Sequence, residues 1–346
     1  MVPEQYNGAS AGSRHFIAYS STHLERGTYT AYCADMANRG DKARVEALCG
    51  ELAALIERMT VADGRQDTAL PALTFWRFSN PTTPAHVIQQ PAVYIVVQGR
   101  KQIIVADTTY RYDPSQYLAV SLELPAIGRV VKASPKEPYL CITLEVDPRE
   151  LASLIVEAGL PPPRDVHDGR ALYVSPLDST LLDALLRLVR LLDAPEDIPV
   201  LAPLILRELQ YRLLQGEAHG RLAEIAIGDS RLRRVAGAIT WIKEHFTEPL
   251  KIETLAKRVN MSPSALHSHF KAVAAISPIQ YQKRLRLQEA RRRLLSDGTN
   301  AETVAYEVGY ASASQFSREY VRLFGQPPRR DAERVRVGLE QATASA

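Results

Sequence analysis

Apolar and polar positions follow two different periods along this chain, and the change of period divides it. Between residues 73 and 146, short apolar or alternating runs are separated by Gly, Asp-Pro and Ser-Pro. Short strands with such turn signals between them are typical of a small barrel or sandwich. The pattern predicts strands at residues 73–78, 93–98, 103–105, 108–112, 117–122, 127–131 and 139–146.

Helical spacing surrounds this β-rich stretch. Residues 1–45 are polar and aperiodic and are predicted to be a disordered tail, and residues 45–59 carry apolar side chains along one helical side. Asp147-Pro148 is predicted to open a helix that ends at Gly159. Residues 179–192 and 200–215 are apolar over most of their circumference, so we expect both to be buried on two sides. The barrel would cover one side, and either a second subunit or the partner helix the other.

The last third of the chain contains one helix–turn–helix pattern written twice. The copies are LAKRVNMSPSALHSHF (residues 255–270) and VAYEVGYASASQFSREY (residues 304–320). Their offset is 49 residues up to the turn and 50 from Ser262 and Ser312 onward, so the extra residue falls in the turn. Residues 278–295 between them form a predicted helix of roughly 27 Å, suited to holding two recognition helices about one DNA turn apart.

Capping residues support each predicted helix of the repeat. Gly309 stands where the turn needs a positive φ, and Gly325 ends the last helix. The N-terminal signals are Ser262 before Pro263 and the capping boxes Ser277/Gln280, Thr299/Glu302 and Ser312/Gln315.

The outward positions of this region are short polar or basic residues, the types that contact phosphates and base edges. A solvated charged face would explain any one of them, but two capped units in register with the same outer chemistry favour duplex DNA. His267, Gln315 and Arg318 are the best candidates for base contacts. The full set of candidate DNA-binding residues is Ser264, Ala265, His267, Ser268, Lys271, Lys283, Arg284, Arg286, Ser312, Ser314, Gln315, Ser317, Arg318 and Arg322.

The charge distribution agrees with this division. The 346 residues carry a formal net charge of +3, but residues 229–346 hold 20 Lys and Arg against 12 Asp and Glu, a net +8. Residues 1–228 hold 22 against 27, a net −5. A basic third on a mildly acidic body indicates that one part meets a polyanion and the other does not.

Residues 229–336 resemble the DNA-binding domain of the AraC/XylS family of bacterial transcription regulators. The stretch VAYEVGYASASQFSREYVRLFGQPP carries the resemblance most specifically, and LAKRVNMSPSALHSHFKAV and SPIQYQKRLRLQEARRRLL also match. The chain departs from the family at Ala275, where the family has glycine and the second repeat has Gly325. If that position takes a positive φ, the alanine should cost about 1 kcal/mol.

Residues 70–160 are similar to the cupin-like regulatory domain of one branch of that family, through YIVVQGRKQIIVADTTYRYDPSQYLAVSLELP. The resemblance implies a domain that senses a small-molecule effector or mediates dimerisation. The aromatic residues of its strands would either line an apolar pocket or fill the core.

Cupin barrels also serve as metal enzymes, which need several histidines. Residues 70–160 contain a single one, His86, so we predict no metal site, no cofactor and no catalytic residues. Three cysteines are too few for a disulfide framework, and no segment has the length and apolarity of a membrane span or the pattern of a secretory signal. We therefore expect a cytoplasmic protein.

The sequence thus predicts an α+β multidomain fold. Its parts are a tail (residues 1–45), a cupin-like regulatory β-barrel (46–165), a helical layer and linker with a dimerisation role (166–228), an all-α domain of two helix–turn–helix units joined by a linker helix (229–336) and a second tail (337–346). The expected partners are double-stranded DNA, a small-molecule effector, a second copy of the chain and RNA polymerase. The alternatives are a constitutive DNA-binding regulator whose barrel is an interaction module, and a cupin enzyme fused to a DNA-binding domain, which the histidine count disfavours.

Overall fold

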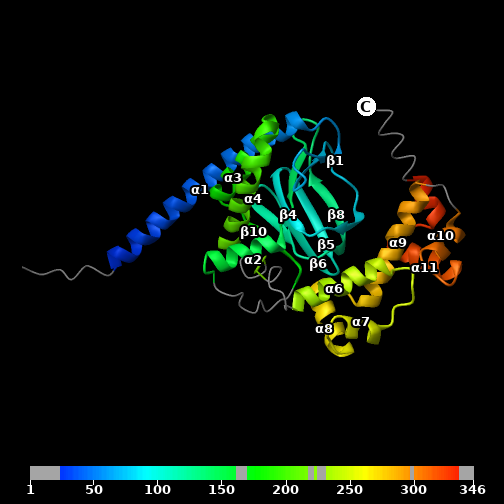
Figure 1. The fold of residues 1–346 in the computed structure, drawn as a ribbon. Coiled ribbons are helices and arrows are strands. Elements are labelled where there is room, and N and C mark those ends of the chain that lie inside the picture. Colours follow the sequence, from blue (N-terminus) through cyan, green and yellow to red (C-terminus); the bar gives the residue numbers. More distant parts are fainter. Residues whose placement is uncertain (1–23, 161–169, 217–221, 224–230, 297–299, 335–346) are drawn as a thin grey trace, which may run out of the picture. The chain divides into compact units, whose positions relative to one another are not determined.

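The computed structural model describes residues 24–160, 170–216, 222–223, 231–296 and 300–334 (Figure 1). The chain forms two compact units, residues 1–43 and residues 44–346. The described residues of the first unit are helical and belong to α1 (Leu24–Met59). The predicted tail is therefore wrong for residues 24–44, which continue the helix expected from residue 45. No apolar stripe marks that stretch, so periodicity could not reveal the helix.

The second unit opens with two antiparallel sheets that pack face to face. The first has the strand order β1-β2-β9-β4-β7-β10 and the second the order β3-β8-β5-β6. The strands are β1 (Gly64–Asp67), β2 (Leu73–Phe78), β3 (Ala85–Gln89), β4 (Ala92–Gln98), β5 (Arg100–Val105), β6 (Thr108–Tyr112), β7 (Gln116–Val120), β8 (Leu124–Lys132), β9 (Tyr139–Leu144) and β10 (Leu172–Pro176). All seven predicted strands are present, whereas β1, β3 and β10 were not predicted.

Strand alternation gives the first sheet two buried faces. In β4, Val93 and Ile95 belong to a core shared with the helices, whereas Tyr94 and Val96 belong to the core between the sheets. Every residue from Ala92 to Val97 is therefore buried, which explains the continuous apolar run. The apolar run thus indicates that this sheet is covered on both faces, by the helices on one and by the second sheet on the other.

The helical layer covers the outer face of the first sheet (Figure 1). It consists of the part of α1 from Val45 to Met59, α2 (Pro148–Glu157), α3 (Ser179–Arg190) and α4 (Ile198–Gln215). Asp147 caps α2 by accepting a hydrogen bond from the Arg149 amide at 2.8 Å, as predicted. Leu182, Leu185 and Leu188 of α3 are fully buried.

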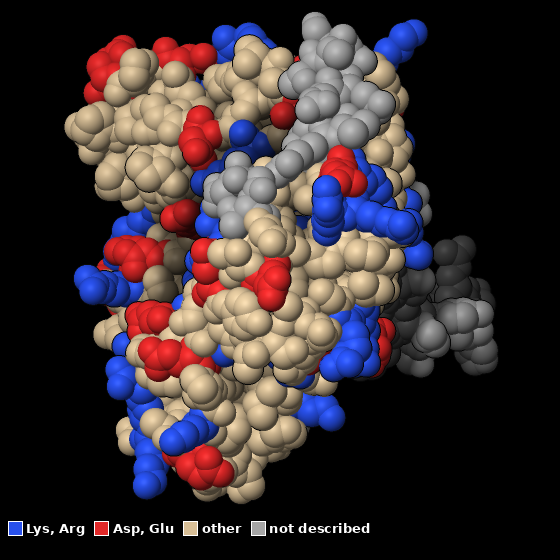
Figure 2. Space-filling view, turned by 90° about the vertical axis from the view of Figure 1, so that its right-hand side faces the viewer, with Lys and Arg blue, Asp and Glu red and all other residues tan. Residues whose placement is uncertain are grey.

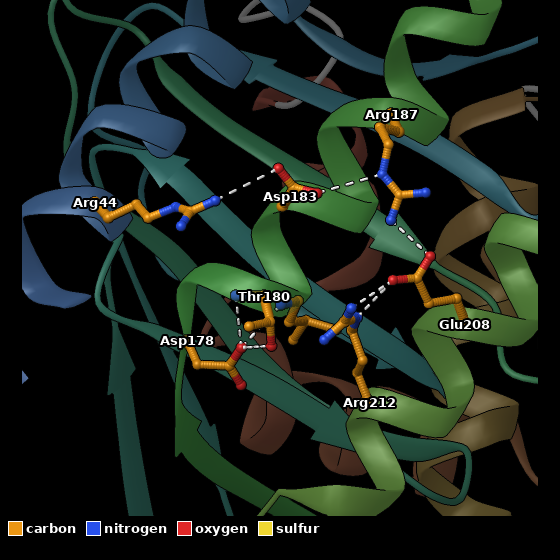
Figure 3. Close-up of polar contacts among 8 residues, drawn as sticks. Arg44, Asp178, Thr180, Asp183, Arg187, Glu208 and Arg212 are labelled. Carbon is orange, nitrogen blue, oxygen red and sulfur yellow. Dashed lines mark hydrogen bonds and ion pairs between the residues drawn. The ribbon is translucent and has the colours of Figure 1, made fainter.

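A chain of ion pairs ties the polar sides of these helices together (Figure 3). Asp183 lies between Arg44 (3.9 Å) and Arg187 (3.3 Å), and Glu208 lies between Arg187 and Arg212 at 2.6 Å each. The Arg187 and Arg212 hydrogen bonds outweigh the effect of burial and lower the pKa of Glu208. The Arg187–Glu208 pair thus links α3 to α4 at the surface, outside the apolar core.

The C-terminal region is helical, as predicted. Its helices are α6 (Arg231–Glu244), α7 (Ile252–Arg258), α8 (Pro263–Ala274), α9 (Pro278–Ser296), α10 (Ala301–Glu307) and α11 (Ala313–Phe324). Helices α7–α8 and α10–α11 are the two predicted helix–turn–helix units, and α9 is the linker helix. None of the described helices is long and apolar enough to span a membrane.

Candidate nucleic-acid interface

The first helix–turn–helix unit is held by the turn and cap that the sequence predicts. The Ser262 side chain accepts a hydrogen bond from the Ala265 amide at 3.2 Å and so begins α8. Asn260 takes a positive φ of 52° in the turn, a conformation that asparagine tolerates better than most residues. Leu266 and Phe270 are fully buried, which turns the opposite side of α8 outward.

The first unit ends in a left-handed residue that is not glycine. Ala275 has a φ of 61° at the C-cap of α8. The position therefore takes the positive φ for which the alanine is expected to lower stability. A residue with a Cβ loses about 1 kcal/mol of stability in this left-handed conformation.

The second unit has the same plan with glycine at both special positions. Gly309 has a φ of 90° in the turn, and a Cβ there would lie 2.2 Å from the Thr247 carbonyl oxygen. Gly325 has a φ of 78° at the C-cap of α11. Ser312 caps α11 as predicted, accepting from the Gln315 amide at 3.4 Å. The predicted capping box at α10 needs correction: Asn300 caps the helix, and Thr299 lies outside the described residues.

Most candidate DNA-binding residues of the recognition helices are on the surface. The exposed ones are Ser264, His267, Ser268 and Lys271 on α8 and Ser314, Gln315, Arg318 and Arg322 on α11, while Ala265, Ser312 and Ser317 are half-buried. Within the described residues, Lys271, Arg318 and Arg322 have no ion-pair partner. These three cations are therefore available to an external anion.

The linker-helix candidates have partners inside the protein. Arg286 donates to the backbone carbonyl oxygens of Phe246 (2.5 Å), Gly309 (2.6 Å) and Glu248 (2.8 Å). Lys283 pairs with Glu319 at 2.7 Å. Arg284 is half-buried beside His86 and Leu323, and burial lowers its pKa. Arg286 and Lys283 thus make contacts that position the two units, and Arg284 is partly withdrawn from solvent.

Two acidic residues that sequence reasoning missed anchor the second unit. Glu319 accepts from Lys283, Tyr310 and Gln315, and these bonds outweigh burial and lower its pKa. Asp331 is fully buried and accepts from Arg291 (2.7 Å), Tyr320 (3.0 Å) and Arg334 (2.9 Å). Sequence periodicity does not reveal these pairs, because Lys283 and Arg291 lie 36 and 40 residues before Glu319 and Asp331.

These internal pairs explain the appearance of the surface. Figure 2 shows Lys and Arg at several separate places on one face, with Asp and Glu between them. Arg292 and Arg293, for example, both bind Glu289, and their hydrogen bonds lower its pKa to about 2. The net charge of the region therefore overstates the number of cations free to meet DNA.

The first unit shares its core with the two sheets. Leu255, Leu266 and Phe270 belong to the same buried cluster as Val120 and Leu124. Polar contacts cross the same boundary: Lys243 of α6 pairs with the buried Glu123, the Tyr281 hydroxyl donates to the Glu123 carbonyl at 3.2 Å, and the Ala171 amide donates to the Val273 carbonyl at 3.2 Å.

A cavity of about 570 Å³ lies beside this boundary. It is lined by Val93, Val120 and Tyr173 of the first sheet and by Leu232, Ala236 and Ile239 of α6. Its walls are mainly apolar, and its volume falls in the range of small-molecule sites. None of the described residues form a group of His, Cys, Asp or Glu able to hold a metal ion.

Comparisons with known proteins agree with the two-part structure. The family model for the AraC-type transcriptional regulator N-terminus matches residues 69–221, and the model for a helix-turn-helix domain matches residues 255–334. Together the two models cover most of the two-sheet domain, the helical layer and both helix–turn–helix units.

The transcriptional activator RhaS of Pectobacterium carotovorum is 29% identical over 140 residues, 40% of this chain and 47% of that protein. RhaS of Escherichia fergusonii is 34% identical over 101 residues, 29% of this chain and 35% of that protein. The chain thus spans half or less of the length of these curated relatives. Apo ToxT from Vibrio cholerae shares the fold, with a TM-score of 0.51 at 10% identity over 77% of this chain and 98% of that one.

Proposed function

Because the chain belongs to the AraC family of transcriptional regulators, we propose that it controls transcription by binding duplex DNA through its two helix–turn–helix units. The observation that carries the proposal is the pair of exposed recognition-helix faces, with three cations that have no ion-pair partner among the described residues: Lys271 on α8 and Arg318 and Arg322 on α11. Ser264, Ser268, Ser314 and Ser317 would contact phosphates beside them, and His267, Gln315 and Arg318 would contact base edges.

The DNA-binding proposal is tested by fluorescence anisotropy on a DNA fragment selected from genomic DNA. Neutralisation of phosphates predicts that log K falls linearly with log salt concentration. Arg318→Ala should weaken the selected site by about 1–3 kcal/mol and relax base preference at one position. The control Arg111→Ala removes an exposed arginine of β6 and should change nothing. Failure of the wild type to distinguish any sequence from random DNA would overturn the proposal.

The two-sheet domain supplies control by a small-molecule effector. The cavity between the first sheet and α6 supports this, because its walls include the elements that hold the first unit. Occupation of such a cavity would change how α6 packs and therefore how α8 is presented. Thermal shift against a metabolite panel separates this role from a constitutive regulator, since an interaction module alone shows no shift with any compound.

The helical layer supplies homodimerisation. Val200, Leu204 and Tyr211 lie along α4 at spacings of four and seven residues and are 68%, 62% and 39% exposed. An apolar helix face of this kind fits a second copy of the chain. Leu204→Glu should convert a dimer into a monomer in sedimentation velocity, and a monomeric wild type would contradict the assignment. We expect a regulator of this kind to act in the cytoplasm together with RNA polymerase. We propose no enzymatic reaction for it.

A further inference from the structure

A lysine stands at an inward position of the second sheet. In β5, Ile103 and Val105 point into the core between the sheets, and Lys101 occupies the same face two residues earlier. Its cross-strand partners are the buried Tyr112 on β6 and Val130 on β8. An apolar side chain is the expected occupant of such a position, so the lysine requires an explanation.

The Lys101 ammonium has no counter-charge in the described part of the chain. Among the residues that the structure describes, no carboxylate lies within ion-pair distance of the Lys101 Nζ and no group accepts a hydrogen bond from it. The Trp76 ring, 5.8 Å from Nζ, is the aromatic group that faces it. Lys101 is half-buried, and this burial lowers its pKa, as expected for an ammonium without a counter-charge.

Lys101 lines a cavity of about 560 Å³ between the two sheets. One part of the wall is apolar and aromatic, formed by Trp76, Phe78, Tyr94, Val87 and Val130, and polar side chains, among them Arg65, Gln89 and Arg129, line the rest. The Trp76 indole is fixed by a hydrogen bond of 2.9 Å from Nε1 to the Thr143 hydroxyl. The one carboxylate among the lining residues, Glu145, is exposed, so it is solvated rather than paired with the lysine.

We propose that this cavity binds a small organic anion, a monocarboxylate on an apolar or aromatic body, with Lys101 as its counter-ion. The carboxylate would supply the charge that Lys101 lacks, and Trp76, Phe78 and Tyr94 would cover the apolar body. This cavity is separate from the one beside α6 to which the proposed function assigns the effector, so ligand binding here goes beyond that function and is measurable without DNA.

The test uses isothermal titration calorimetry on the full chain with two probes and their uncharged amides: hydrocinnamate with hydrocinnamamide, and biphenylcarboxylate with biphenylcarboxamide. We expect the carboxylates to bind the wild type at least about tenfold more tightly than the amides, a difference typical of one satisfied charge. Lys101→Met should abolish that preference and leave amide binding unchanged. Lys136→Met, at an exposed loop position, should behave as the wild type.

Thermal unfolding without ligand gives a second readout. Lys101→Met should raise Tm, because it removes an uncompensated charge and keeps an unbranched side chain of similar length. A lysine that merely stabilises the fold would give a lower Tm. The proposal is overturned if no carboxylate of the panel binds the wild type at millimolar concentration, or if Lys101→Met binds the carboxylates as tightly as the wild type. Lys101→Met should still bind DNA. A wild type that binds the carboxylates but does not distinguish DNA sequences would count against the proposed function alone.

Discussion

The two helix–turn–helix units follow one plan but differ in what their cores contact. The first unit packs Leu266 and Phe270 into the cluster that also fills the space between the two sheets. The second packs Phe316 and Tyr320 into a separate cluster with α9 and α10. The comparison shows that two copies of one motif can be buried differently: the core of the first is continuous with that of the two-sheet domain, whereas the core of the second is a separate cluster.

The second unit meets the two-sheet domain through a surface contact instead of a shared core. The ring of His86 on β3 packs edge-on against Phe324 at the end of α11, with centroids 5.1 Å apart. A change in the two-sheet domain should therefore reach α8 through buried packing and α11 through one half-buried ring contact. The predictions below separate these two routes, beginning with the largest expected effect.

Truncation of the two equivalent core phenylalanines should have different consequences. Phe270→Ala and Phe316→Ala should each lose about 3–5 kcal/mol of unfolding free energy, because both rings are fully buried. Phe270→Ala should destabilise the two-sheet domain together with the first unit. Phe316→Ala should melt the second unit alone. Calorimetry combined with fluorescence of Trp76, measured in a Trp241→Phe background because Trp241 of α6 is the second tryptophan, distinguishes the outcomes. Equal effects of both variants on that signal would remove the distinction.

The buried carboxylate at the boundary tests the polar part of the shared core. Glu123→Gln removes the partner of Lys243 and should lower the unfolding free energy by about 1–3 kcal/mol, measured by urea denaturation. The matched control is Glu333→Gln, which breaks the exposed pair with Arg329 and should have no measurable effect. A Glu123 variant as stable as the control would show that the boundary is held by apolar packing alone.

The C-caps provide a reciprocal exchange between the units. Ala275→Gly should stabilise the chain by about 1 kcal/mol and Gly325→Ala should destabilise it by a similar amount, because both positions take a positive φ. The space around Gly325 is open to a Cβ, so its effect is conformational and not steric. Chemical denaturation measures both. An unchanged Ala275→Gly would mean that the first unit tolerates its alanine without strain.

The smallest effect concerns pH and the second unit. Burial lowers the pKa of His86, and Arg284 and Arg291 nearby act in the same direction. The unfolded chain, with a histidine pKa of about 6.5, then takes up the proton more readily than the folded chain. Stability should therefore fall as pH falls below that value, until the folded pKa is passed. Stability curves of His86→Gln should lack this component; an identical pH dependence in wild type and variant would contradict the assignment.

Much of the fold could be predicted from local patterns. Seven strands, α3, α4, α9 and both helix–turn–helix units follow from apolar spacing and from caps such as Ser262 and Ser312, where cause and effect lie within a few residues. The missed elements lack such a signal. Helix α1 begins at Leu24 in a stretch without an apolar stripe, and β10 (Leu172–Pro176) gains its place by pairing with β7, about 50 residues earlier.

The sequence predicted the kinds of residue at the candidate interface, but not which of its basic residues bind other parts of the protein. Sequence reasoning placed Lys271, Arg318 and Arg322 on outer faces, and the structure leaves them there without ion-pair partners in the described residues. It grouped Arg286 and Lys283 with them, although carbonyl oxygens and Glu319 occupy those side chains. A basic residue that faces solvent and one that ties two segments together look alike in one dimension, because the partner lies far along the chain.

Hydrogen exchange in the full-length protein tests most directly whether the first unit alone shares the core of the two-sheet domain. Leu124→Ala removes a buried side chain of that core on β8. The account predicts faster amide exchange in β5 and in α8, with exchange in α11 unchanged. Faster exchange in α8 and α11 alike, or unchanged exchange in α8 while β5 accelerates, would contradict it.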